Sequence, residues 1–295
     1  MRYSRIRKRQ ARKRYTTLIL IILLGFSIVY IFSAGQLGKL VSNLLLSVIN
    51  GESKGEESKT DYDDPVLTVP ENTEEPARDT VKVTETLKTN ALTIYAIQMG
   101  AFTDGSNAEA FAQELRNKGG AGYILDDGFY RVMAIGFQSE EDAQKVRKGL
   151  KDDDIEAHVY KMAASGVNME ITATKDNVAA ISSAYESWEK NYRSLEDIIV
   201  SLDSGSVSPI EASDRIRAIK TEMGQMKNQL QEISSNQSNN AILSGLAALY
   251  DSSCQSLDKV LSKNVDDKVA ISSVIKYTYI DMFMQYKDYM EQITK

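Results

Sequence analysis

One pattern of apolar and polar positions occurs twice in the middle of the chain, offset by 35 residues. The first copy runs from Tyr95 to Ile124 and the second from Tyr130 to Val159. In each copy apolar residues alternate with period two, then recur every three or four positions, and then alternate again. This order predicts strand, helix, strand, written twice. Such a duplicated unit closes into a βαββαβ, ferredoxin-like domain over residues 91–163. Its four-stranded antiparallel sheet has both helices on one face, and we expect the other face to be open.

Short polar signals support these boundaries. Ser106, followed three residues later by Glu109, is typical of a capped helix start, and Ser139 with the acidic residues after it is a weaker version. The run Asp126-Asp127-Gly128 predicts the turn between the two central strands.

The chain after residue 166 has a helical pattern throughout. Apolar residues recur at three-and-four spacing from Val178 to Leu202 and again from Ile216 to Ile233, and two further stretches come after them. Pro209 after Ser208 is typical of a helix start. Trp188 occupies a core position in this spacing, so we interpret it as core. We expect a bundle of three or four antiparallel helices over residues 167–295, which makes the fold class α+β.

The N-terminal residues are basic and are followed by an apolar run. Eight of the first 14 residues are Arg or Lys, and no charge occurs between Thr16 and Ser33. Because about 18–20 apolar residues cross a bilayer, residues 16–33 are predicted to form a single transmembrane helix, with a weaker apolar run continuing to residue 49. The basic residues 1–15 then form a cytoplasmic tail, and everything after the span lies outside the membrane. A cleaved signal peptide, cut near Ala34, is the alternative, but the apolar segment exceeds the usual length.

Residues 51–90 differ in composition from the repeated domain after them. They are rich in Asp and Glu, contain Pro65, Pro70 and Pro76, and have few large apolar side chains. Such a segment buries too little surface to offset the entropy of ordering, so we expect a disordered acidic linker.

Composition narrows the function. The formal charge is −6, and removing the eight N-terminal positive charges leaves −6 − 8 = −14 for the rest, which disfavours nucleic acid as a partner. The chain has one cysteine, Cys254, and one histidine, His158. A histidine-cluster metal site is therefore excluded, and no motif organises the carboxylates for catalysis. We expect no enzymatic activity, no cofactor and no metal.

The segment Ile97-Gln98-Met99-Gly100-Ala101-Phe102, followed by Asn107-Ala108-Glu109, resembles the first strand and helix start of the SPOR domain. The later segment Tyr130-Arg131-Val132, with Phe137 in register, resembles the third strand, although the family's usual Gly-Pro pair before this Phe is replaced by Ile135-Gly136. The resemblance covers about residues 93–162. It implies a peptidoglycan-binding module that binds glycan strands lacking stem peptides and directs its owner to septa. The layout of span, spacer and domain also resembles the stage II sporulation protein B group.

In this family the ligand lies on the sheet face opposite the helices, and the resemblance places Gln98 at the matching motif position. Strand alternation adds the other outward-facing residues to the candidate site. Amide and guanidinium groups bond sugar hydroxyls and carboxylates, and aromatic faces cover sugar C–H groups. The predicted glycan-binding residues are Gln98, Tyr123, Phe129, Arg131, Met133, His158 and Tyr160.

The function predicted from these observations is a membrane-anchored, non-catalytic peptidoglycan-binding protein of the division or sporulation septum. Its expected partners are denuded glycan strands, the cytoplasmic membrane and a septal or sporulation protein that meets the C-terminal helices. The alternative is a partner-docking or oligomerising scaffold in which the helical bundle carries the main function and the SPOR-like domain only localises it.

Overall fold

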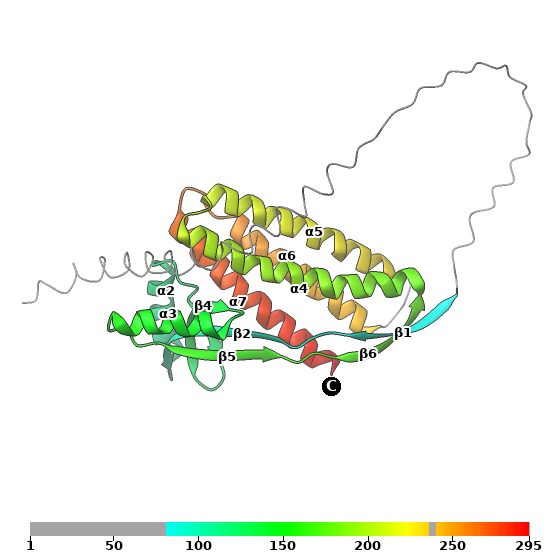
Figure 1. Ribbon diagram of the computed structural model, residues 1–295, viewed down its shortest axis with the longest axis horizontal. Coiled ribbons are helices and arrows are strands. Elements are labelled where there is room, and N and C mark those ends of the chain that lie inside the picture. Colours follow the sequence, from blue (N-terminus) through cyan, green and yellow to red (C-terminus); the bar gives the residue numbers. More distant parts are fainter. Residues whose placement is uncertain (1–80, 236–239, 295) are drawn as a thin grey trace, which may run out of the picture. The chain divides into compact units, whose positions relative to one another are not determined.

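The computed structural model describes residues 81–235 and 240–294 (Figure 1). Its central sheet has four antiparallel strands in the order β3-β4-β2-β5. These strands are β2 (Leu92–Phe102), β3 (Tyr123–Asp126), β4 (Tyr130–Phe137) and β5 (His158–Ala164). Helix α2 (Gly105–Arg116) follows β2, and helix α3 (Glu140–Asp152) follows β4. The predicted βαββαβ order, the four-stranded antiparallel sheet and the α+β class are confirmed.

The helix starts are set by side-chain caps. Helix α2 begins after Asp104, whose side chain accepts a hydrogen bond from the backbone N–H of Asn107 at 2.9 Å. The predicted cap at Ser106 is therefore two residues late, because Asp104 supplies the acceptor first. Helix α3 begins after Ser139, whose Oγ accepts from the Asp142 N–H at 3.3 Å, as predicted. Gly128, with φ of 98°, makes the tight turn between β3 and β4.

Two strands outside the predicted domain extend it. Strand β1 (Lys82–Lys88) pairs antiparallel with β6 (Asn168–Thr174) in a separate two-stranded sheet. The predicted linker over residues 51–90 is therefore wrong for residues 82–88, and the helical region begins at Lys175 rather than at residue 167. The error has a physical cause. Each of the two strands has only a weak apolar alternation in its sequence, and each is stabilised by ladder hydrogen bonds to a partner that lies far away in the chain. Residues 1–80, with the predicted tail, span and most of the linker, lie outside the described residues.

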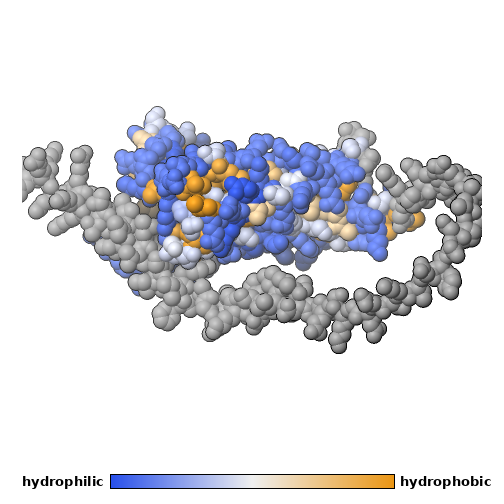
Figure 2. Space-filling model, turned by 90° about the horizontal axis from the view of Figure 1, so that it is seen from above, coloured by the Kyte–Doolittle hydropathy of each residue, from blue (hydrophilic) through white to orange (hydrophobic). Residues whose placement is uncertain are grey.

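Four helices form the C-terminal region: α4 (Lys175–Ser204), α5 (Pro209–Ser235), α6 (Ala241–Leu261) and α7 (Lys268–Ile293). Helix α4 ends at Gly205, which has a left-handed φ of 76°. Helix α5 starts at Pro209, where the Glu211 N–H donates to Ser208 Oγ at 3.2 Å. Polar residues dominate the described surface seen in Figure 2. Within the described ranges, no helix combines the length and the apolar character that a membrane span requires.

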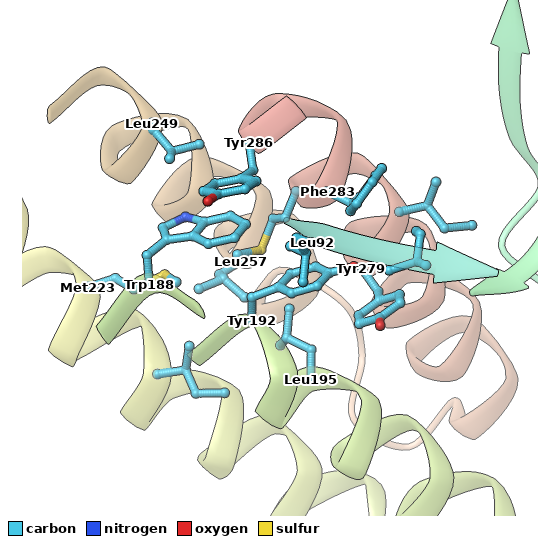
Figure 3. Close-up of a cluster of buried hydrophobic side chains, with 14 of the residues drawn as sticks. Leu92, Trp188, Tyr192, Leu195, Met223, Leu249, Leu257, Tyr279, Phe283 and Tyr286 are labelled. Atoms are coloured by element: carbon cyan, nitrogen blue, oxygen red, sulfur yellow. The ribbon is translucent and has the colours of Figure 1, made fainter. Parts of the chain in front are cut away.

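A column of aromatic rings forms the centre of the helical core (Figure 3). Tyr286, Trp188, Tyr192 and Tyr279 stack in that order, with successive ring centroids 4.5, 5.2 and 4.7 Å apart. Trp188 is 1% exposed and its indole N–H donates to Ser253 Oγ at 3.1 Å, so its predicted core role is confirmed. Stacked aromatic rings bury large apolar areas and limit the ways in which helices can pack.

Helix α7 covers part of the sheet face opposite α2 and α3. A Cβ on Gly136 of β4 would lie 3.0 Å from the ring of Tyr279, and the rings of Tyr123 and Tyr277 are 5.1 Å apart. Ser273 Oγ also donates to the carbonyl of Gly120 at 2.8 Å, just before β3. The expectation that this face is wholly open is therefore wrong. The bundle and the sheet share one continuous apolar core.

Candidate functional site

Four polar and charged side chains meet at one end of the same sheet face: Asp127, Arg131 and Tyr160 are partly exposed, whereas Gln98 is only 8% exposed. Arg131 of β4 donates from Nε to Asp127 Oδ2 at 2.8 Å and from a terminal nitrogen to Gln98 Oε1 at 3.2 Å. The Tyr160 hydroxyl of β5 donates to Asp127 Oδ2 at 2.7 Å. Three adjacent strands and the β3–β4 turn thus converge on one guanidinium group.

Two aromatic rings flank this guanidinium. Its Cζ atom lies 5.5 Å from the centroid of the Phe129 ring and 5.2 Å from that of the Tyr160 ring. Cation–π attraction at these distances restrains the Arg131 side chain. Phe129 is 47% exposed, so one large apolar ring faces solvent beside the charged group. We call Gln98, Asp127, Phe129, Arg131 and Tyr160 the Arg131 cluster.

Hydrogen bonding sets the charge state of the cluster. The pKa of Asp127 is lowered, first by the hydrogen bond from Tyr160 and then by those from Arg131. The same bond to Asp127 raises the pKa of the Tyr160 hydroxyl. Asp127 therefore stays ionised and Tyr160 stays protonated at neutral pH. The carboxylate balances the guanidinium charge and fixes its orientation, while N–H donors remain for a ligand because a guanidinium carries five.

Strand register explains why these side chains meet. Gln98 lies opposite His158 on β5 and opposite Met133 on β4, and the β2–β4 ladder shifts register on both sides of Gln98. Such irregularities re-aim side chains at the ends of sheets. Gly128 lets the turn close tightly, which brings Asp127 within hydrogen-bond reach of Arg131, four residues later.

The structure brings together four of the seven predicted residues: Gln98, Phe129, Arg131 and Tyr160. His158 lies next to Gln98 in the register, with a side chain that is 63% exposed and an Nε2 atom 3.6 Å from Glu156. It borders the cluster rather than joining it.

Tyr123 and Met133 are placed differently from the prediction. Met133 is fully buried, so its predicted contact with a ligand is wrong for this structure. Tyr123 packs against Tyr277, and burial raises the pKa of its hydroxyl. Both side chains have the predicted outward direction on the sheet, but helix α7 takes the place of solvent above them.

Asp127 is the site residue that sequence reasoning misses. Its place in an Asp-Asp-Gly run indicates only a turn. The additional signal is an acidic residue four positions before an outward-facing arginine, across a tight turn. That spacing lets the carboxylate fold back onto the guanidinium.

The arrangement suits reversible binding of a polar ring that has an apolar face. Arg131 offers N–H donors, Asp127 offers acceptor oxygens, and the Phe129 ring covers C–H groups, while the buried Gln98 holds the guanidinium through its Oε1 atom.

Comparison with known proteins finds a family match for one part of the chain. Residues 91–161 match the SPOR domain family, a range that begins just before β2 and ends within β5. All five residues of the Arg131 cluster lie inside that range. No curated protein and no solved structure matches the chain. The sheet with helices α2 and α3 is therefore the part of this chain that matches the SPOR domain family.

Proposed function

We propose that this chain binds peptidoglycan glycan strands lacking stem peptides through the Arg131 cluster, and that this binding gathers it at the division or sporulation septum without catalysing a reaction. SPOR domains are binding domains with a peptidoglycan-binding, septum-localising role, and residues 91–161 match that family. The observation that carries the proposal is the position of the cluster at one end of the SPOR sheet, where Phe129 is 47% exposed and Arg131 and Asp127 are partly exposed.

The chemistry of a denuded strand fits the cluster. Removal of a stem peptide leaves a free lactyl carboxylate on each muramic acid, and a guanidinium binds carboxylates through charge-assisted hydrogen bonds. Arg131 uses Nε for Asp127 and one terminal nitrogen for Gln98, which leaves further N–H donors. An intact stem peptide converts that carboxylate into an amide and removes the charge. The exposed Phe129 ring then covers the apolar face of a neighbouring sugar.

Membrane attachment is the second part of the proposal. The basic residues 1–15 and the uncharged residues 16–33 favour a single-pass anchor with its N-terminus in the cytoplasm, and the acidic residues after them favour a spacer. The likeness to the stage II sporulation protein B group rests on this layout and stays a prediction. That the C-terminal helices bind a septal protein also stays a prediction.

A pelleting assay with purified sacculi tests the ligand. The soluble part from Val81 onward, which keeps β1 paired with β6, is mixed with sacculi before and after amidase treatment. We expect Arg131→Ala to lower binding to the treated sacculi by about tenfold, since one charge-assisted contact contributes about 1.5–3 kcal/mol. Arg147→Ala changes an exposed arginine on α3, on the opposite side of the sheet, and should leave binding unchanged. Equal binding of the unaltered protein to treated and untreated sacculi would rule out the ligand assignment.

A further inference from the structure

Asp127 places a carboxylate of the chain itself on the guanidinium that the proposed function assigns to the glycan. Its two oxygens accept from Arg131 Nε at 2.9 and 2.8 Å, and Oδ2 also accepts from the Tyr160 hydroxyl at 2.7 Å. The Arg131 and Asp127 side chains are 23% and 30% exposed, so a ligand can reach this ion pair from solvent. In the free protein, the two donor groups therefore already hold a carboxylate.

The donors that remain on Arg131 are less favourable for a second carboxylate. A carboxylate binds a guanidinium most strongly through two parallel N–H groups. Asp127 occupies Nε, so a ligand that leaves this contact in place has only the two terminal nitrogens. One of these already donates to Oε1 of Gln98 at 3.2 Å, and that side chain is only 8% exposed. A two-point contact with the ligand is therefore easiest where Asp127 now lies.

The balance of charge also favours exchange over addition. Asp127 balances the single positive charge of the guanidinium, and Asp126 is the preceding residue of the same turn. A lactyl carboxylate added beside this ion pair would give the site a net negative charge, and like charges at close range repel each other. Replacement of one carboxylate by another keeps the charge of Arg131 balanced.

The rest of the cluster holds Arg131 without help from Asp127. Gln98 accepts from the guanidinium, and the centroids of the Phe129 and Tyr160 rings lie 5.5 and 5.2 Å from its Cζ atom. The turn is closed by the Asp127 backbone N–H, which donates to the carbonyl of Phe129 at 3.3 Å and does not involve the carboxylate. Rotation of the Asp127 side chain therefore frees the guanidinium while the turn keeps this bond.

We propose that Asp127 is an internal competitor of the glycan: the lactyl carboxylate displaces the Asp127 carboxylate and takes over its contacts with Arg131 Nε and the Tyr160 hydroxyl. This inference rests on the proposed function and concerns the selectivity of the same site. Because an existing ion pair must break first, a small anion that brings only a carboxylate gains little from the exchange. A glycan also packs on the Phe129 ring, so it is selected over free carboxylates.

Calorimetric titration of the full chain, in detergent to accommodate its apolar N-terminal segment, tests the competition. The ligands are a peptide-free glycan of four sugars and the same glycan with its lactyl carboxylates converted to primary amides. Asp127→Asn keeps the shape of the side chain but removes its charge. We expect this variant to raise affinity for the acidic glycan by about fivefold, the upper range for a partly exposed ion pair, and to raise affinity for the amidated glycan less.

The matched control is Asp126→Asn, which removes the same charge from the same turn but leaves the ion pair of Asp127 with Arg131 intact. Asp126 Oδ1 accepts from the Gly128 N–H at 3.3 Å, and an amide oxygen preserves that contact. This control should change affinity for the acidic glycan by less than about twofold. The competition is overturned if Asp127→Asn lowers that affinity, raises it no more than the control does, or raises it equally for both glycans. Absence of binding by the unaltered chain and by both variants would instead refute the proposed function.

Tyr160→Phe gives a second test of the exchange. The Tyr160 hydroxyl donates to Asp127 in the free protein, and in the complex it donates to the ligand carboxylate, so its removal weakens both states. The variant should therefore lower affinity for the acidic glycan by about threefold more in the Asp127→Asn background than in the otherwise unaltered chain. Equal losses in the two backgrounds would contradict the exchange.

Discussion

Lys276 of α7 joins three parts of the protein in one buried contact: α7 itself, α4 and the loop before β3. Its Nζ atom lies 2.7 Å from Asp203 Oδ2 of α4 and donates to the carbonyl of Gly119, before β3, at 2.9 Å. The Lys276 and Asp203 side chains are only 9% and 10% exposed. Asp203 Oδ1 also accepts from Ser272 at 2.6 Å. Removing the lysine alone leaves a carboxylate buried without its counter-charge.

The expected cost of Lys276→Met comes from that environment. Breaking a buried ion pair from one side costs about 3–5 kcal/mol, because the remaining charge keeps its desolvation penalty. The double variant Lys276→Met/Asp203→Asn removes both charges and leaves mainly the Gly119 carbonyl without its donor, a cost of about 1–3 kcal/mol. For a folded unit of this size, a loss of 3–5 kcal/mol lowers the melting temperature by about 6–20 °C.

Urea denaturation of the soluble part, followed by circular dichroism, measures these free energies. The matched control is Lys287→Met on the same helix, where the native lysine pairs with Glu291 at a partly exposed site, and this variant should lose no more than about 1 kcal/mol. A loss below about 1 kcal/mol for Lys276→Met would refute the reasoning. Simple additivity of the Lys276→Met and Asp203→Asn effects would refute it as well.

Three further predictions concern packing and pH. Gly166→Ala would place a Cβ 2.3 Å from the carbonyl oxygen of Thr89, so we expect it to lower the free energy of unfolding, measured by urea denaturation, by about 1–3 kcal/mol. The control is Gly224→Ala in α5, where a Cβ would have no neighbour within 4 Å, and it should raise the free energy of unfolding by about 0.5–1 kcal/mol. Burial raises the pKa of Glu196, so ionising it costs stability, and stability falls as pH rises from the ordinary carboxyl pKa through the raised one. Glu196→Gln should remove that part of the pH dependence, and identical melting curves of the two proteins against pH would contradict this. Trp188→Ala should cost about 3–5 kcal/mol in the same urea assay, whereas a loss under about 1 kcal/mol would mean that the aromatic column is not central to the core.

The strands and helices of the SPOR domain are predictable because their signals are local. Period-two alternation around Ile97 and three-and-four spacing around Ala108 each require only a dozen residues of chain. Pairing of β1 with β6 is not predictable in this way. Its partners, such as Val83 and Ala173, are 90 residues apart, and neither strand has a strong pattern of its own.

The sequence predicts the sheet face to which the site side chains point, but it does not predict whether that face is exposed to solvent. Alternation correctly places Gln98, Arg131 and Tyr160 on one face, because side-chain direction is a property of the strand itself. Whether that face meets water depends on a helix more than 100 residues further along the chain. A signal is present: the covered end of β2 carries Ile94 and Ala96, both fully buried, where an open face would leave them in water.

Hydrogen–deuterium exchange of the full chain, with and without a peptide-free glycan, tests the central claim most directly. We predict that the glycan slows amide exchange in residues 127–131 and 158–160, around the Arg131 cluster. We also predict that exchange in α2, α3 and the part of the sheet under α7 is unchanged. Slowed exchange confined to α2 and α3, or none at the Arg131 cluster, would contradict the assignment of the glycan site.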